Sequence, residues 1–490
     1  MKVCRKLGIA LFALAWCSIA IAQEPFTAGT WTRTTNNPSS TVAHALLLSD
    51  GSVLVNSMYF QNHSDPWYRL VPDATGSYTN GKWINAGTLP SGYNPLYFAS
   101  TMLPSGQVVI FGGEYNNGGS VWTTKGALFN PVTNTWTSLT APSGWTTVGD
   151  AQSILLQSGH MMLANCCTTQ QAILTLNGTT ATWASTGTGK SDWNDEEGWT
   201  LLPNGNILTV DAYVSGGCCK MGYQLYNEAT GTWTTASNTT VVNLVDPGSL
   251  ELGPAPLLPN GTVFGSGATT NNAIYTVSTG TWAVAPSFGN SLDIADGPAA
   301  VLPNGNALFD TSPGIFNTGS KFFEWDGTTL NATSAPPNAG IDSSYVGGMV
   351  VLPTGQVLFT DFSSDVEIYT PASTAPCAGC APTIKHVATT LTHGSKSNRI
   401  AGTLFDGMDQ GGYYGDDNQA DSNFPLVRIT DSKNHVVYCR SHNWTPGLVA
   451  TGSKIMTTLF DIPASIATGP ASLVVVANGI PSAPVQVTIN

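Results

Sequence analysis

Charged side chains are scarce in this chain, since only 10% of its 490 residues are Asp, Glu, Lys or Arg. Basic residues are the rarer kind, 17 against 30 acidic ones, and the formal net charge is −13. A protein with so few cations gains little by releasing the counterions of a nucleic acid or of an anionic membrane. The composition therefore excludes both as expected partners.

Helical periodicity and long apolar runs are missing beyond the first residues. The chain opens with a basic segment, continues with an apolar run from Leu7 to about Ala22, and ends that run on the small residues Ala20 and Ala22. This order is typical of a signal peptide, which we assign to residues 1–22. No later stretch is long enough to insert into a membrane. We therefore expect a secreted protein, extracellular or periplasmic.

Short catalytic motifs are also absent: there is no G-x-S-x-G elbow, and the seven histidines form no local pair with metal-ligand spacing. Nine cysteines occur, two of them in the predicted signal peptide. In an oxidising compartment the others are expected to form disulfides, and their odd number leaves one over, for which Cys439 is the candidate. Cys377 and Cys380 are expected to form a short disulfide rather than a zinc or redox motif. The adjacent cysteines Cys166–Cys167 and Cys218–Cys219 either bond within each pair or bridge neighbouring segments.

One β-hairpin pattern is present, and it occurs seven times. Each copy is a short apolar strand, a turn and a second apolar strand, as in "GWTLLPNGNILTVD" (198–211). The turns contain glycines, which supply the positive φ of a tight hairpin: Gly51, Gly106, Gly159, Gly205, Gly261, Gly305 and Gly355. These glycines are 44 to 56 residues apart, which is the period of propeller blades. The pattern predicts an all-β, seven-bladed β-propeller.

A tryptophan recurs between the hairpins. The copies that follow the first six hairpins are Trp83, Trp136, Trp183, Trp233, Trp282 and Trp325. The seventh hairpin has none after it, but "AGTWTRT" carries Trp31 at the other end of the domain. We therefore expect an N-terminal strand to complete the last blade and close the ring, which removes exposed sheet edges.

This pattern resembles kelch repeats, and the whole mature chain resembles the galactose oxidase-like propellers. The resemblance implies a propeller at residues 23–371, a Pro/Ala/Cys linker at 372–381, and an immunoglobulin-like early-set β-sandwich at 382–490 that ends in "PASLVVVANGIPSAPVQVTIN".

Acidic and phenolic residues flank the hairpins on one side only. Residues just before the first strand and just after the second lie at the same end of a blade, near the central channel. At these positions stand Asn56, Tyr97, Glu114, Tyr115, Asp150, Asp195, Glu196, Glu197, Asp211, Asp296, Asp310, Tyr345 and Asp361. Convergent carboxylates and aromatic rings suit a metal ion, a cationic group or the hydroxyls of a sugar. The alternative is that polar residues simply occupy solvated loops.

The resemblance also implies a copper centre of two tyrosines, two histidines and a tyrosine–cysteine cross-link. By position, Tyr97 corresponds to the cross-linked tyrosine, Tyr345 to the second tyrosine, and His442 to the histidine of the C-terminal domain; Tyr115 stands where galactose oxidase has its stacking tryptophan. Two elements depart from the pattern. Val346 replaces the other histidine, and no cysteine precedes the first hairpin, where His44 is the nearest substitute ligand.

The segment "DGMDQGGYYGDDNQADSN" (406–423) concentrates acids among glycines. Such oxygen-rich loops hold calcium, with Asp416, Asp417 and Asp421 as the candidate ligands. The spacing does not match an EF-hand loop, and a solvated loop is the alternative.

These observations favour a secreted propeller that binds a carbohydrate, a polyol or a metal-bridged ligand at its acidic, aromatic mouth. The alternative function is a divergent copper-dependent oxidase of primary alcohols or aldehydes, and a third is an adhesive scaffold. The sequence leaves the cofactor open between two candidates, calcium first and copper, which the oxidase would need, second.

Overall fold

The computed structural model describes residues 26–58, 66–213 and 221–490. The predicted signal peptide and the Cys218–Cys219 pair lie outside the described residues. Within those ranges the one helical element is the 3-10 turn η1 (Ser344–Val346), and the other regular elements are β-strands. The all-β prediction is therefore confirmed. No helix in these ranges is long and apolar enough to cross a bilayer.

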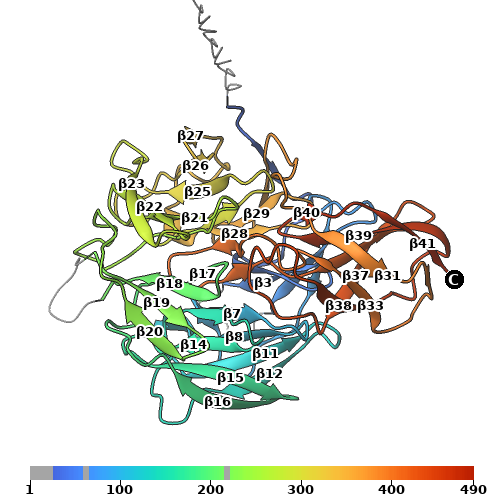
Figure 1. Ribbon diagram of the computed structural model, residues 1–490, viewed down its shortest axis with the longest axis horizontal. Coiled ribbons are helices and arrows are strands. Elements are labelled where there is room, and N and C mark those ends of the chain that lie inside the picture. The colour runs from blue at the N-terminus through green and yellow to red at the C-terminus, as the bar shows by residue number, and fades with distance from the viewer. Residues whose placement is uncertain (1–25, 59–65, 214–220) are drawn as a thin grey trace, which may run out of the picture.

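Each of the seven predicted hairpins lies in a different antiparallel sheet of the described chain (Figure 1). We number the sheets after their hairpins. Sheet 1 contains β2 (Val42–Leu47), β3 (Val53–Ser57), β4 (Tyr68–Val71) and β5 (Lys82–Asn85), and sheet 2 contains β7 (Ala99–Met102), β8 (Val108–Phe111), β11 (Lys125–Asn130) and β12 (Thr135–Thr140). Sheet 3 contains β13 (Ser153–Leu155), β14 (Met161–Ala164), β15 (Gln171–Asn177) and β16 (Thr180–Thr186), sheet 4 contains β17 (Thr200–Leu201), β18 (Asn206–Val210), β19 (Tyr223–Asn227) and β20 (Thr232–Thr235), and sheet 5 contains β21 (Thr262–Ser266), β22 (Asn272–Thr276) and β23 (Thr281–Ala285). Sheet 6 contains β24 (Ala299–Val301), β25 (Ala307–Thr311), β26 (Lys321–Trp325) and β27 (Leu330–Ala332), and sheet 7 contains β28 (Gly348–Val351), β29 (Val357–Thr360), β30 (Glu367–Thr370) and β1 (Thr30–Arg33).

The repeated turn has one geometry throughout. All seven turn glycines adopt φ between 76° and 91°. The N–H of each glycine donates to the carbonyl of the leucine three residues earlier, at 2.8 to 2.9 Å. A three-residue hairpin loop places its last residue in this left-handed region, which favours glycine. The recurring Gly is therefore explained by backbone conformation.

Four of the seven recurring tryptophans, Trp31, Trp83, Trp136 and Trp183, donate a hydrogen bond to a neighbouring sheet or to a loop beside it. The indole N–H of Trp83 donates to the carbonyl of Asn36, next to β1 of sheet 7, at 2.7 Å, and that of Trp136 donates to Ala86 of sheet 1 at 3.1 Å. Trp31 lies in β1, which pairs with β30, and its indole donates to Ser334 near sheet 6 at 2.8 Å. The prediction that an N-terminal strand completes the last hairpin's sheet is confirmed.

The C-terminal strands form a second body, whose orange and red strands gather to one side in Figure 1. They are β31 (Thr383–Val387), β32 (Thr390–Leu391), β33 (Asn398–Thr403), β36 (Leu426–Thr430), β37 (Val436–His442), β38 (Met456–Asp461), β39 (Gly469–Ala477), β40 (Ile480–Pro481) and β41 (Val485–Ile489). The first half of β37 pairs with β36 and the second half with β38. The strands on the β36 side of β37 and those on its β38 side enclose one apolar core, as in a sandwich. This core contains Ile400, Val427 and Phe460.

One hairpin of the C-terminal part leaves that body and enters the propeller. Strands β34 (Gly411–Tyr413) and β35 (Ala420–Asp421) pair with each other, and β34 also pairs with β24 of sheet 6. We call residues 410–419 the axial segment, because it contacts sheets on all sides. Its hydrogen bonds reach His44 of sheet 1, Ser100 of sheet 2, Leu201 of sheet 4, Leu257 beside sheet 5 and Tyr345 beside sheet 7. Only a segment at the centre of a ring of sheets reaches all of these partners.

Candidate functional site

A pocket of about 320 Å³ opens where the innermost strands begin. It is lined by side chains from the starts of successive hairpins and from the loops beside them: Tyr97, Glu114, Tyr115, Asp150, Glu196, Glu251, Asp296, Phe316 and Tyr345. Seven of these residues were predicted to share one rim, and the structure brings them together. We call this hollow the axial pocket.

The backbone before the first strand of several hairpins is left-handed. Tyr97, Glu196 and Asp296 have φ of 52°, 57° and 52°. Each stands nine residues before its turn glycine, and each lines the axial pocket. A positive φ is costly for residues other than glycine, and such conformations concentrate at functional sites. The repeat therefore gives these three side chains one equivalent position around the axis.

Carboxylates meet in two overlapping groups. Carboxylate oxygens of Asp150, Glu196 and Asp416 all lie within 4.8 Å of one another, and the same holds for Glu196, Glu251 and Asp296. Glu196 belongs to both groups. Asp416 comes from the axial segment, so the predicted calcium loop and the predicted rim supply one joint cluster. We call these five residues the axial carboxylates.

Burial and mutual repulsion oppose ionisation of the axial carboxylates. Burial raises the pKa of Asp150, Glu196 and Asp296 well above the usual range, and the charge of Asp416 raises each further. At the edge of the pocket, burial raises the pKa of Glu114 to about 7. No described residue that lines the pocket is basic. The cluster therefore needs either protons or a bound cation to offset its charge.

An aromatic wall closes one side of the pocket. The hydroxyls of Tyr97 and Tyr414 both donate to the carbonyl of Tyr345, at 3.2 and 2.6 Å. The His44 ring lies 5.4 Å from the ring of Tyr97, and its Nδ1 contacts the Asn418 amide. Burial lowers the pKa of His44 to about 3, so the imidazole is neutral. Its Nε2 is buried without a hydrogen-bond partner.

Six of the residues predicted at the mouth do not line the axial pocket. Asn56 accepts a hydrogen bond from the backbone N–H of His44 at 2.6 Å. Glu197 and Asp211 lie near Lys190, whose Nζ is 3.0 Å from Glu197. Asp310 and Asp361, at the ends of the second strands in sheets 6 and 7, are buried near Asp342. Asp195 faces Cys167 Sγ at 3.9 Å. The position of a residue next to a strand determines at which end of the sheet it lies, but not where its side chain points. The expectation that all these side chains share one mouth was therefore too broad.

The prediction that His442 joins the two tyrosines is wrong. His442 Nε2 lies 3.2 Å from Asp461 within the C-terminal body. The next residue, Asn443, donates its backbone N–H to Pro104, in the turn at the other end of β7 from Tyr97. The segment that the C-terminal part sends into the axis is 410–419, and it carries no histidine.

The predicted calcium loop is divided. Asp416 is 3% exposed and Asp417 is fully buried, both in the axial segment, so the alternative of a solvated loop is wrong for them. Asp421 lies apart from them and accepts a hydrogen bond from the Gln410 amide at 3.3 Å. Burial follows from the passage of this segment through the ring, which spacing in sequence cannot reveal.

Sequence reasoning missed Glu251. Its segment, "LELGPAPLLPNG", precedes the fifth hairpin just as Asp150 precedes the third, but Glu251 stands ten residues before its turn glycine. The first strand of this hairpin is reduced to a bridge between Leu257 and Val263. A search that allowed one residue of slippage at each hairpin would have found it.

The pocket predicts an inverse pH dependence of stability for the metal-free protein. Acids whose pKa is raised on folding hold protons that the unfolded chain has lost, so raising the pH from about 5 to about 8 removes stability. Glu114, with its pKa of about 7, falls within this window. We expect thermal unfolding in a chelator to occur at lower temperature at pH 8 than at pH 5. Saturating Ca²⁺ should reverse this order, because bound carboxylates no longer need protons.

The residues present do not fit the two-imidazole copper centre that the resemblance implies. His44 supplies one imidazole with an unpartnered Nε2, beside Tyr97 and Tyr414. The other predicted histidine, His442, is at the opposite end of the sheets. No described cysteine contacts Tyr97 to form a cross-link, since Cys439, the free thiol, is buried in the C-terminal core.

The sequence matches no protein-family model and no curated protein. Among solved structures, the chain is similar to a fungal alcohol oxidase of the AA5 family in complex with copper, with 12% identity, a TM-score of 0.52, and coverage of 95% of this chain and 99% of that one. It also matches a streptogramin B lyase at 11% identity over 71% of this chain and 100% of that one, with a TM-score of 0.49. A surface component of the type-IX secretion system of Porphyromonas gingivalis matches at 13% identity over 90% of this chain and 58% of that one, with a TM-score of 0.43. At these identities the likeness to the alcohol oxidase shows the fold alone.

Proposed function

We propose that this protein is an exported propeller that binds a divalent cation, Ca²⁺ foremost, at the axial carboxylates. In this proposal the cation holds a neutral, hydroxyl-bearing ligand, a sugar or a polyol, in the axial pocket. The observation that carries it is the pair of carboxylate groups joined at Glu196, in which the oxygens of each group approach within 4.8 Å of one another. Their charge has no basic partner among the described lining residues.

The donor set favours a hard cation. Carboxylate oxygens are the ligands that Ca²⁺ prefers, and it accepts six to eight of them in flexible geometry. Groups of buried like charges are strongly unfavourable unless a counter-charge is bound. Asp417, whose two oxygens are buried without a donor, lies close enough to Asp296 and Asp416 for their charges to raise its pKa.

The rest of the pocket supports a small polyhydroxylated ligand. A volume of about 320 Å³ is at the lower end of the range of small-molecule sites. Phe316 and Tyr345 offer apolar ring surface beside the carboxylates, and their ring centroids are 5.5 Å apart. An acidic pocket repels anionic ligands, so a neutral sugar or polyol is favoured over a uronic acid.

Metal analysis of the purified chain, followed by titration of the metal-free protein with Ca²⁺, tests this proposal. We expect bound or readily bound Ca²⁺, and neutral sugars or polyols that bind only when the cation is present. A protein that takes up no divalent cation, and whose ligand binding is indifferent to chelation, would refute it.

The same experiment addresses the alternative, a copper-dependent oxidase of primary alcohols or aldehydes. One observation favours that activity, namely the neutral His44 ring against Tyr97 and Tyr414. The oxidase requires stoichiometric copper and formation of hydrogen peroxide from an alcohol. Absence of both after copper loading would exclude it.

A further inference from the structure

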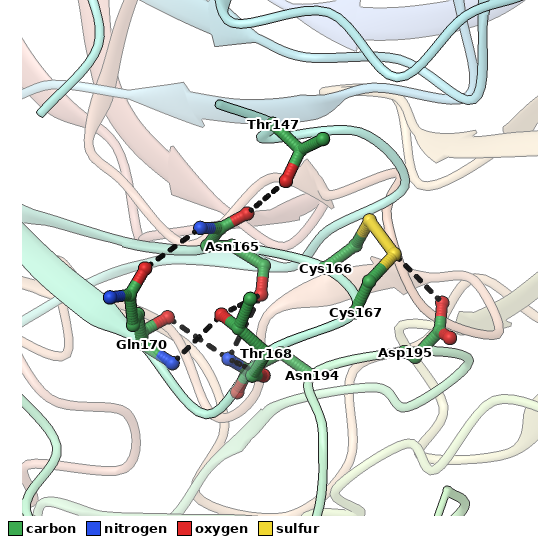
Figure 2. The surroundings of a disulfide bond; sticks show 8 residues. All are labelled: Thr147, Asn165, Cys166, Cys167, Thr168, Gln170, Asn194 and Asp195. Atoms are coloured by element: carbon green, nitrogen blue, oxygen red, sulfur yellow. Dashed lines mark hydrogen bonds between the residues drawn. A yellow bond between two sulfur atoms is a disulfide. The ribbon is translucent and has the colours of Figure 1, made fainter. Parts of the chain in front are cut away.

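A disulfide between adjacent residues lies near the axial carboxylates but outside the pocket lining. Cys166 is bonded to Cys167 just after β14, and the Asp195 carboxylate lies 3.9 Å from Cys167 Sγ (Figure 2). The two sulfurs and one oxygen of Asp195 are within 4.8 Å of one another. Cys166 is fully buried whereas Cys167 is half-buried, so solvent reaches this bond from the Cys167 side.

The two loops that carry these groups are held together without the sulfurs. The Asn194 side-chain amide donates to three backbone carbonyls of the cysteine loop, those of Asn165 at 3.2 Å, Thr168 at 2.9 Å and Gln170 at 2.9 Å (Figure 2). Asn194 is fully buried and directly precedes Asp195. The spacing between Asp195 and the cysteines therefore does not depend on the disulfide being closed.

We propose that Cys166, Cys167 and Asp195 form a redox-dependent site for a thiophilic cation such as Zn²⁺. In the oxidised protein the two sulfurs are bonded to each other. In the reduced protein, two thiolates and one carboxylate converge from a scaffold that is already in place. Three protein ligands, two of them thiolates and one a carboxylate, suit Zn²⁺, which keeps its fourth position for water or an external ligand.

An external dithiol supplies the two electrons. Its thiolate attacks Cys167 Sγ, the more accessible sulfur, the disulfide breaks, and Cys166 leaves as a thiolate. The second thiol of the reductant then displaces Cys167 and closes the reductant into its own cyclic disulfide. The pair has then gained two electrons and two protons, and Zn²⁺ displaces the protons when it binds.

This site is chemically distinct from the axial carboxylates. The axial site offers oxygen ligands only, which favour Ca²⁺, whereas thiolates favour softer cations. The two sites can therefore be examined separately in one protein, and failure of the thiolate site leaves the proposed function untouched.

Titration of the dithiol-reduced, anaerobically desalted chain with Cd²⁺ tests the inference. Cd²⁺ is a thiophilic probe whose thiolate complexes absorb in the ultraviolet, and excess Ca²⁺ keeps the axial site filled. We expect a tight Cd²⁺ equivalent with sulfur-to-metal absorption in the reduced protein and none in the oxidised protein. The double variant Cys166→Ser/Cys167→Ser should lose this equivalent, whereas the matched control Cys377→Ser/Cys380→Ser should keep it.

Two single variants leave both cysteines in place. Asp195→Asn removes the oxygen ligand, and Asn194→Ala removes the positioning amide; each should weaken Cd²⁺ binding about 10-fold or more while the number of titratable thiols stays unchanged. Unaltered Cd²⁺ affinity in Asp195→Asn, or an unaltered signal in the double cysteine variant, would overturn the assignment.

Discussion

Replacing Glu196 by glutamine is expected to abolish cation binding at the axis. Glu196 is the one residue shared by both carboxylate groups, so the variant removes a charged ligand from each. We expect Ca²⁺ affinity to fall by at least about 100-fold, which corresponds to ~2.7 kcal/mol. Isothermal titration of the metal-free protein with Ca²⁺ measures this loss. Ligand binding that depends on the cation should disappear with it.

The same variant should have the opposite effect on the metal-free protein. Without a cation, Glu196 adds repulsion to a buried cluster, and burial together with Asp416 and Asp296 raises its pKa. Removing its charge should therefore stabilise the chelated protein at pH 8, where repulsion is largest. Glu228→Gln is the matched control, because Glu228 contacts Ser158 at the turn end of the sheets, away from the pocket. A loss of stability in chelator without any change in Ca²⁺ affinity would show that Glu196 is structural.

The ring of sheets was predictable because its signals are local. Short stretches of sequence that recur with a regular period indicate the positive φ of Gly205 in its hairpin. Another such stretch, around Trp31, indicates an edge strand. Periodicity also gave the end of the sheets at which Asp150 and Glu196 lie. The turn glycine and the end of the sheet need only the geometry of one hairpin, whereas the place of Trp31 also needs the comparison of all seven repeats.

The site was less predictable because its parts meet over long distances in sequence. The axial segment brings Asp416 next to Asp150 from the C-terminal region, and nothing in "GGYYGDDNQ" signals that it passes through the ring. Likewise, three consecutive acids diverge: Asp195 faces Cys167, Glu196 lines the pocket, and Glu197 turns to Lys190. The positive φ of Glu196 breaks the regular alternation of side chains, which the sequence pattern assumes.

We expect the largest effect on stability from removing Lys190, the partner of Glu197. Lys190, Asp192 and Glu197 have fully buried side chains, and the Lys190 ammonium contacts both carboxylates. It also lies 5.5 Å from the centre of the Trp233 ring. Removing the ammonium leaves two buried carboxylates without a counter-charge, which is more costly than the net contribution of the ion pairs. We expect Lys190→Met to lose about 3–5 kcal/mol of unfolding free energy, measured by urea denaturation.

The pH dependence of that loss identifies its cause. Burial raises the pKa of both Asp192 and Glu197 even with Lys190 present, so without the lysine they can fold only as neutral acids. The destabilisation by Lys190→Met should therefore be smaller at about pH 5 than at about pH 8. The triple variant Lys190→Met/Asp192→Asn/Glu197→Gln should recover most of the stability, because every buried charge is then gone. Equal losses at both pH values, or no recovery in the triple variant, would assign the effect to packing of the lysine stem against Trp233 rather than to charge.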